Sequence, residues 1–260
     1  MSHTKIYKKR IVIKIGTESI ITKEGLNEKR IISLAWQIRD MQNSFRQSPI
    51  IVTSGAIAAG KRKIRLEDLK DSNDININQA YASIGQPVLM NEYIKAFDYT
   101  GVTVGQFLLT AEDFDSKTKL ENLRSTYKHF VKNKVVPIVN ENDVIATEEI
   151  KFGDNDKLAA LLTCSLDADV LLILSHIDGI YKNGKVVGYA RSYKKENYDN
   201  MAISKEGRGG LQSKLNAAKI VNEAGKPCII SNADYDITSI LFGKTKRTVF
   251  LPKNDDGWLR

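Results

Sequence analysis

The sequence predicts an α/β fold with a mainly parallel central sheet that is covered by helices on both faces. The first observation behind this prediction is that short apolar runs of strand length alternate along the chain with longer segments of helical spacing. The second is size, because 260 residues with 42% hydrophobic and 27% charged side chains can bury a full core. We therefore expect one domain spanning residues 1–260.

The first elements follow a strand, helix, strand, helix order. Residues 11–15 form an apolar run that ends at a glycine, which predicts a strand, and the apolar spacing over 27–41 predicts the helix that follows. A second apolar run at 50–52 breaks at a Thr-Ser-Gly turn into a helical segment at 56–64. The same alternation predicts helices at 77–96, 120–132, 156–166 and 211–224, and strands at 102–109, 135–139, 170–174, 228–231 and 248–251.

Three segments interrupt this alternation. A small hairpin is expected over 144–150, and the Asn-Gly pair within 181–186 is typical of a tight hairpin turn. The polar stretch 194–207 is expected to be a surface loop. None of the three indicates a second domain.

Charge and composition exclude several classes of protein. The net charge is +8, but the 39 basic residues are spread along the chain and accompany no nucleic-acid-binding motif, so we expect a basic surface that steers small anions and no nucleic-acid partner. Cys164 and Cys228 lie far apart and are expected to be small buried hydrophobes. The three histidines and two cysteines lack metal-ligand spacing, so no protein-held metal is expected. No apolar segment resembles a leader or a membrane span, which predicts a cytoplasmic protein.

The most informative segment is a polar loop at residues 140–156. It holds six carboxylates and three amides, lies between a predicted strand and a predicted helix, and contrasts with a basic chain. Asp154, Asn155 or Asp156 could each be a helix cap, but one cap needs one side chain. Junctions of this kind are where open parallel sheets bind small ligands, so the cluster predicts a binding site.

Three other segments are suited to phosphate or to a polar substrate. Gly207, Gly209 and Gly210 directly precede a predicted helix, where free N–H groups can hold a phosphate, although an ordinary flexible loop explains them equally well. Lys14 ends a predicted strand and is either a phosphate ligand or a lysine that reaches out to solvent. Ser54 offers a hydroxyl to a substrate or caps the helix that follows it.

Together these motifs closely resemble the glutamate 5-kinases, a branch of the amino acid kinase family, from about residue 10 to residue 252. The acidic motifs are specific to that branch, whereas Lys14 and the glycine-rich segment are shared more widely. The resemblance implies an amino acid kinase-like αβα sandwich. It is carried by the segments Lys14–Thr17, Val52–Gly60, Gly85-Gln86, Gly105–Thr110, Val139–Asp143, Ile150–Asp156 and Asp178–Tyr181.

The resemblance implies transfer of the ATP γ-phosphoryl group to the side-chain carboxylate of L-glutamate, with Mg²⁺ accompanying ATP. Lys14 and Lys214 would flank the transferring group, and Asp156 would orient them. The other roles implied are glutamate binding by Ser54, Asp143 and Asn155, with Asp143 suited to the α-ammonium group, and nucleotide binding by Lys14, Ser175, His176, Arg208, Gly209, Gly210, Leu211, Gln212, Ser213 and Lys214.

The chemistry of this reaction suits a chain with few histidines. A carboxylate is already ionised at neutral pH, so it needs no general base to become a nucleophile. What remains is the repulsion between two anions, which positioning and cations overcome in phosphoryl transfer.

The chain departs from the family pattern beside the nucleotide, and its segment between Tyr181 and Gly207 is shorter than is usual in the family. Ser175-His176 replaces the usual Thr-Asp beside the nucleotide, and Arg208 replaces a threonine in the glycine-rich segment. The chain also stops before the C-terminal PUA domain that many relatives append. As for partners, the resemblance implies a homo-oligomer, proline as a feedback ligand and hand-off of the product to glutamyl phosphate reductase.

Two alternative functions compete with this interpretation. One is another acid kinase of the same fold, acting on aspartate, an acylated glutamate or carbamate. The other is an inactive relative that senses a ligand or binds nucleic acid, which is disfavoured because Lys14, Lys214 and Asp156 are all present.

Overall fold

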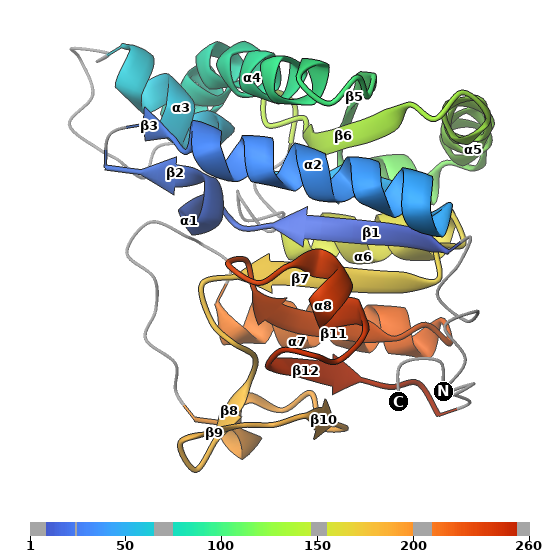
Figure 1. The fold of residues 1–260 in the computed structure, drawn as a ribbon. Helices are drawn as coiled ribbons and strands as arrows, with labels where there is room; N and C mark the ends of the chain where they lie inside the picture. Colours follow the sequence, from blue (N-terminus) through green and yellow to red (C-terminus); the bar gives the residue numbers. More distant parts are fainter. Residues whose placement is uncertain (1–8, 24, 65–74, 147–154, 200–209, 254–260) are drawn as a thin grey trace.

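The computed structural model describes residues 9–23, 25–64, 75–146, 155–199 and 210–253. Its centre is an eight-stranded sheet with helices on both faces (Figure 1). The strands of this sheet are β1 (Arg10–Ile15), β4 (Ser48–Val52), β5 (Val104–Leu109), β6 (Val136–Glu141), β7 (Val170–Ser175), β10 (Tyr189–Ala190), β11 (Cys228–Asn232) and β12 (Arg247–Phe250). Two further pairs, β2 (Ile21–Thr22) with β3 (Gly25–Leu26) and β8 (Tyr181–Lys182) with β9 (Lys185–Val186), form separate two-stranded sheets.

The strand order is β10-β12-β11-β7-β1-β4-β6-β5. From β11 to β5 all neighbouring strands are parallel, and β12 runs antiparallel to β11. The predicted α/β class with a mainly parallel sheet is therefore confirmed. The antiparallel β12 was not anticipated, because an apolar run predicts a strand without predicting its direction.

Ten helical segments connect these strands in the described residues. The α-helices are α1 (Thr17–Ile20), α2 (Glu28–Phe45), α3 (Ala56–Lys63), α4 (Ile75–Asp98), α5 (Lys117–Lys132), α6 (Asn155–Ser165), α7 (Leu211–Glu223) and α8 (Ile237–Leu241). The 3₁₀ segments are η2 (Ala111–Asp115) and η3 (Lys195–Asn197). In Figure 1, α2 and α8 lie in front of the sheet and α6 and α7 lie behind it.

The sheet separates two apolar clusters, and β1 contributes to both. Ile11 and Ile13 pack with α2, α4 and α8 on one face, whereas Val12 packs with α6 and α7 on the other. Successive side chains of a strand point to opposite faces, so a strand covered on both sides must be apolar at almost every position. Lys14 is the buried charged residue of β1, and its burial is explained by the site described below.

Helices α3 and α4 touch at two glycines. A Cβ atom on Gly85 would lie 1.8 Å from the carbonyl oxygen of Ala56, and one on Gly60 would lie 1.9 Å from the carbonyl oxygen of Tyr81. Both distances are far inside van der Waals contact, so only glycine permits this approach. The contact fixes α4 against the turn that follows β4.

Gly85→Ala is expected to lower the free energy of unfolding by about 2 kcal/mol or more, because overpacking outweighs the gain in helix propensity. Urea denaturation monitored by circular dichroism would measure the change. Gly188→Ala is the matched control, since its Cβ meets nothing within 4 Å. Equal stability of the two variants would contradict the proposed clash.

Several short elements were missed or differ from prediction. Helices α1 and α8 and strands β2, β3 and β10 have five residues or fewer, which is too short for a periodic pattern. The hairpin predicted at 144–150 is wrong in its described part, since residues 143–145 form a turn and residue 146 is not in a strand, and the rest lies outside the described residues. The stretch 194–207 contains η3, and its residues from 200 onward also lie outside the described part.

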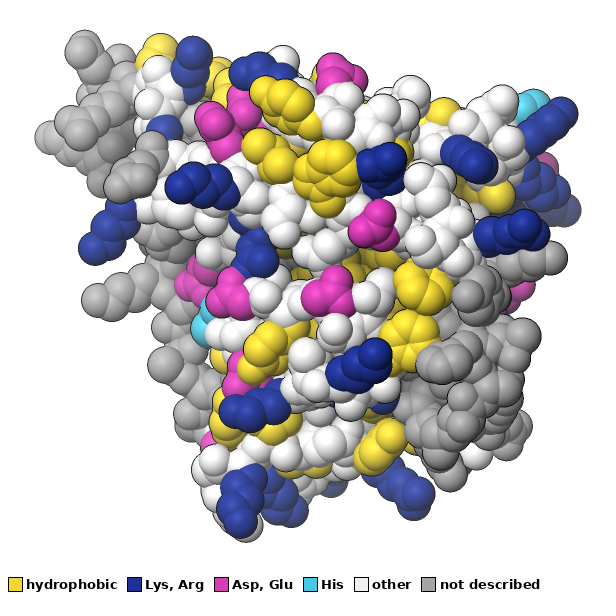
Figure 2. Space-filling view, in the orientation of Figure 1, with side chains coloured by type: hydrophobic (Ala, Val, Ile, Leu, Met, Phe, Trp, Pro, Cys, Tyr) yellow, Lys and Arg dark blue, Asp and Glu magenta, His cyan; other side chains and the backbone are white. Residues whose placement is uncertain are grey.

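Other predictions are confirmed or corrected individually. The hairpin at 181–186 is confirmed, with Asn183 at φ 51° and Gly184 at φ 71° in its turn. Cys228 is buried as expected, but Cys164 is only half-buried. Lys and Arg side chains are scattered over the face in Figure 2. Within the described residues, no helix combines the length and the apolar character that a membrane span requires.

Candidate active site

The predicted site residues gather at the carboxyl edge of the parallel strands. Lys14 is near the end of β1, Ser54 follows β4, and Ser175 ends β7. Neighbouring parallel strands end at the same edge of a sheet, so residues distant in sequence meet there. Asp156 lies in the first turn of α6 and Lys214 in the first turn of α7, and these two helices pack against each other.

A buried ion cluster joins three of these elements. The Asp156 carboxylate pairs with Lys14, at 2.6 Å between Oδ1 and Nζ, and with Lys214, at 3.3 Å between Oδ2 and Nζ. The Asp156 side chain is fully buried, and the two lysine side chains are only 5% and 7% exposed. One buried anion thus holds two buried cations, and the cluster carries a net positive charge.

The pKa of the Asp156 carboxyl reflects these neighbours. Burial alone would raise this pKa, but the positive charges of Lys14 and Lys214 outweigh burial and lower it well below the ordinary aspartate value. The hydroxyl of Ser213 also stabilises the anion by donating to Oδ2 at 2.9 Å. Asp156 is therefore ionised at neutral pH and is suited to positioning cations.

The amino end of α7 is arranged to receive an anion. Its N-cap residue, Gly210, provides no side-chain cap for the first N–H groups, and a Cβ atom there would meet nothing within 4 Å. The N–H groups at a helix start and the helix dipole favour a phosphate at this position. The adjoining Lys214 ammonium lies in the same turn. The residues present therefore fit a nucleotide phosphate.

The other predicted nucleotide residues lie in different surroundings. Ser175 is buried, and His176 is half-exposed and pairs with Glu18 at 2.7 Å between Nδ1 and Oε2. Leu211 packs into the core, and the Gln212 side chain donates to Asn216 at 2.9 Å along its own helix. Arg208 and Gly209 lie outside the described residues. Glu18 was missed by the sequence analysis because α1 had not been predicted.

Asn155 organises a buried amide cluster beside the ion cluster. Its Nδ2 group donates to the carbonyl oxygen of Thr53 at 2.5 Å, to Ser54 Oγ at 3.0 Å and to Asn140 Oδ1 at 2.8 Å. An amide has two hydrogens for these three acceptors, so one hydrogen is shared. Ser54 and Asn155 are therefore brought together as predicted, with Asn140 as an unpredicted third member.

Asp143 lies apart from this cluster, in a cavity of about 450 Å³. Gln86 from α4 and Glu141 from the end of β6 line the same cavity. Asn140 and Gln86 were not among the predicted site residues, although both fall in motifs that carried the resemblance. Their positions become visible only once α4 is packed against the sheet.

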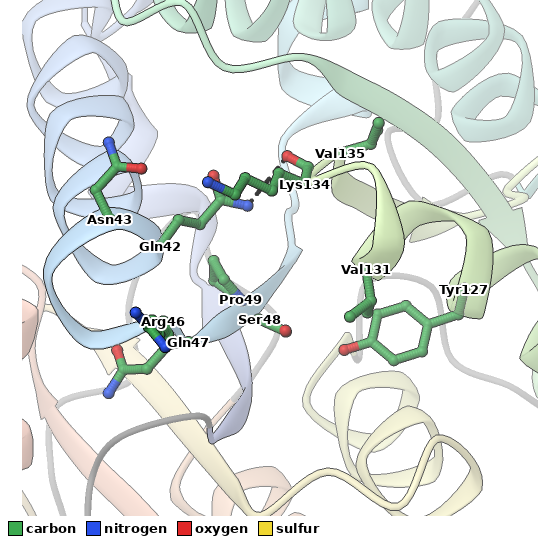
Figure 3. Close-up of a pocket in the computed structure, with 10 residues that line it drawn as sticks. All are labelled: Gln42, Asn43, Arg46, Gln47, Ser48, Pro49, Tyr127, Val131, Lys134 and Val135. Carbon is green, nitrogen blue, oxygen red and sulfur yellow. Dashed lines mark hydrogen bonds between the residues drawn. The ribbon is translucent and has the colours of Figure 1, made fainter.

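A second cavity, of about 560 Å³, lies at the opposite, amino-terminal edge of the sheet. Figure 3 shows Gln42 from α2 and Tyr127 from α5 on its walls, with Ser48 at the start of β4 between them. Gln42 closes one side by donating to the carbonyl oxygen of Lys134 at 3.1 Å. None of the predicted site residues that the structure describes lines this cavity.

The chain matches the amino acid kinase family over residues 9–232. It is 39% identical to the glutamate 5-kinase of Clostridium acetobutylicum over 94% of this chain and 95% of that protein, and 38% identical to that of Dictyoglomus thermophilum over 94% and 68%. Its fold is similar to that of a carbamate kinase from Giardia lamblia bound to AMP-PNP, with a TM-score of 0.67 at 14% identity and coverage of 94% and 99%. The chain therefore belongs to the amino acid kinase family, and within it to the glutamate 5-kinases.

Proposed function

We propose that this protein transfers the γ-phosphoryl group of ATP to the side-chain carboxylate of L-glutamate and so forms glutamyl 5-phosphate, the first step of proline synthesis. The observation that carries this proposal is the buried Lys14–Asp156–Lys214 cluster beside the amide cluster of Asn155. The cations suit a transferring phosphoryl group, and the amides suit a polar substrate. Family membership and identity to glutamate 5-kinases support the choice of substrate.

In the reaction, an oxygen of the glutamate γ-carboxylate forms a bond to the γ-phosphorus. The bond from that phosphorus to the bridging oxygen of ADP breaks, and ADP leaves with the electron pair. No proton has to be removed from the nucleophile, because a carboxylate is ionised at neutral pH. The task of the protein is to hold two anions in line and to stabilise the charge that develops between them.

Lys14 and Lys214 together stabilise the charge that develops between the two anions. Asp156 holds both ammonium groups in a buried environment, where their charge is screened less than at the surface. Donors that are preorganised in this way each contribute about 3–4 kcal/mol of transition-state stabilisation. The uncapped amino end of α7 receives the nucleotide phosphates next to Lys214.

Mg²⁺ fits this site as the partner of ATP. Among the described residues, no group of three or more His, Cys, Asp or Glu side chains could hold a metal ion, and Asp156 is committed to two lysines and Ser213. Magnesium in kinases is held largely by phosphate oxygens and water, and when bound it neutralises phosphate charge. The chain itself supplies the lysine cations.

Trapping of the acyl phosphate tests the proposed function. Purified protein with ATP, Mg²⁺ and hydroxylamine should form a hydroxamate from L-glutamate. Aspartate, N-acetylglutamate and carbamate, supplied in parallel, should give much less product. Preferential phosphorylation of one of these three would instead identify another acid kinase of the same fold, and ATP binding without any turnover would indicate an inactive relative.

Asp143→Asn is expected to raise the glutamate KM about 10- to 100-fold with little change in kcat. Asp143 is buried in the cavity that Gln86 also lines, and a carboxylate there would pair with the substrate α-ammonium group. A hydrogen bond to a charged group contributes about 1.5–3 kcal/mol, which sets the expected range. Steady-state kinetics with varied glutamate would measure the change, and an unchanged KM would contradict the assigned role.

Several expectations from the sequence are part of this proposal. They are a cytoplasmic protein with one domain over 1–260, assembly as a homo-oligomer, feedback inhibition by proline, and hand-off of the labile product to glutamyl phosphate reductase. An acyl phosphate hydrolyses readily in water, which is the chemical reason for the hand-off.

A further inference from the structure

A chain of three side-chain amides leads from the centre of the candidate site to the wall of the Asp143 cavity. Asn155 donates to Asn140 at 2.8 Å, and Asn140 Nδ2 donates in turn to Gln86 Oε1 at 2.7 Å. Asn155 begins α6, Asn140 is in β6 and Gln86 is in α4. This series of hydrogen bonds therefore connects the neighbourhood of the ion cluster to helix α4, on the other side of the cavity.

The direction of these hydrogen bonds is fixed by the backbone. The carbonyl oxygen of Thr53 can only accept, so the group of Asn155 that lies 2.5 Å from it must be the NH₂ group. Asn140 must then present its oxygen to Asn155 and its NH₂ group to Gln86. Gln86 uses its oxygen to complete the chain, and its own NH₂ group is the terminal donor.

The location of Gln86 is also fixed. Gly85 brings α4 against Ala56 at a distance that excludes any Cβ atom, and Gln86 follows it directly. The Gln86 side chain is half-buried and lines the same cavity as Asp143 and Glu141. Gln86 is therefore held as a donor in a cavity where, among the described lining residues, the charged groups are the carboxylates of Glu141 and Asp143.

We propose that Gln86 is a specificity-determining residue that donates a hydrogen bond to the α-carboxylate of the amino acid substrate. This proposal rests on the proposed function. An amino acid brings an ammonium group, which suits the carboxylate of Asp143, and an α-carboxylate, which the acidic cavity would repel unless a donor faces it. The reacting carboxylate belongs at the other end of the amide chain, where Asn155 adjoins Asp156.

Two analogues of glutamate separate the groups that the cavity recognises. Glutarate lacks the ammonium group, and 4-aminobutyrate lacks the α-carboxylate. Both are tested as inhibitors of the wild-type protein and of Gln86→Met, alongside kcat/KM for glutamate. Gln42→Met, which alters an amide at the opposite edge of the sheet, is the matched control.

Gln86→Met is expected to weaken glutarate inhibition and to lower kcat/KM for glutamate by about 10- to 100-fold, mainly through KM. Inhibition by 4-aminobutyrate should change less than about threefold, because that molecule has no α-carboxylate for Gln86 to bind. The control variant should match the wild type in all three measurements.

If Gln86→Met weakened inhibition by glutarate and inhibition by 4-aminobutyrate equally, the proposal would be overturned. The role of Gln86 would then be limited to positioning the Asn155 side chain. Unchanged kcat/KM in Gln86→Met would also overturn it while leaving the glutamate kinase activity intact. If the wild-type protein forms no hydroxamate from glutamate, the proposed function fails first and the assignment of Gln86 fails with it.

Discussion

Replacing either Lys14 or Lys214 with methionine is expected to lower kcat about 10²–10³-fold, which is the usual cost of removing one preorganised transition-state contact. Both ammonium groups are nearly excluded from solvent and share one carboxylate. Methionine keeps most of the length and apolar volume of the lysine stem, so the main loss is the charge. Steady-state assays at saturating ATP and glutamate would measure it.

Lys119→Met provides the matched control, since this lysine is 61% exposed and pairs with Asp113 at the surface. Its kcat should stay within about twofold of the wild-type value, because surface pairs contribute little. Lys14→Arg should not restore activity, because a planar guanidinium group cannot replace a compact ammonium at 2.6 Å from Oδ1. Near-normal turnover in folded Lys14→Met or Lys214→Met would refute the role of that lysine.

Asp156→Asn is expected to reduce the free energy of unfolding by about 3–5 kcal/mol and to abolish measurable turnover. The substitution keeps the shape of the side chain but leaves two buried ammonium groups without their anion. Removing one partner from a buried ion pair is costly because the remaining charge is desolvated and unpaired. Urea denaturation at neutral pH would measure the loss.

The pH dependence of the stability difference between wild type and Asp156→Asn tests the ionisation of Asp156. The pKa of Asp156 in the folded protein lies below its ordinary value, so the unfolded chain takes up this proton first as the pH falls. The stability difference between wild type and Asp156→Asn should therefore be constant from about pH 5 to pH 8 and should shrink below about pH 4, near the pKa of an unfolded aspartate. A difference that grows on acidification would contradict the assigned ionisation.

The sequence predicted the long elements well and the short ones poorly. β1 and β7 consist mostly of buried apolar residues, and α2 has five buried apolar residues at helical spacing, so hydrophobic periodicity reveals them. α1 and α8 have four and five residues, which is too short for a repeating pattern, and of the two only α8 has a side-chain cap, Asp236. The turn at 143–145 contains the β-branched residues Val144 and Ile145, which are suited to a strand, but tertiary context decided otherwise.

The candidate site was predictable as a set of residue types but not as a set of contacts. Lys14, Asp156 and Lys214 could be named because the motifs that hold them resemble those of the glutamate 5-kinases, and Lys14 also lies at the end of a predicted strand. That Asp156 divides its two oxygens between the lysines, and that Ser213 shares one of them, depends on how α6 and α7 pack. Spacing along the chain carries no information about such distances.

By itself, the sequence determined the α/β class, the alternation of strands and helices, and the chemical groups available at the carboxyl edge. Local propensity and hydrophobic patterning act over a few residues, so they can specify these features. Only the tertiary structure decided the antiparallel β12, the burial of Lys14 and the amide chain that ends at Gln86. Each of these depends on groups far apart in sequence, such as Gln86 and Asn140, being brought within hydrogen-bonding distance by helix and sheet packing.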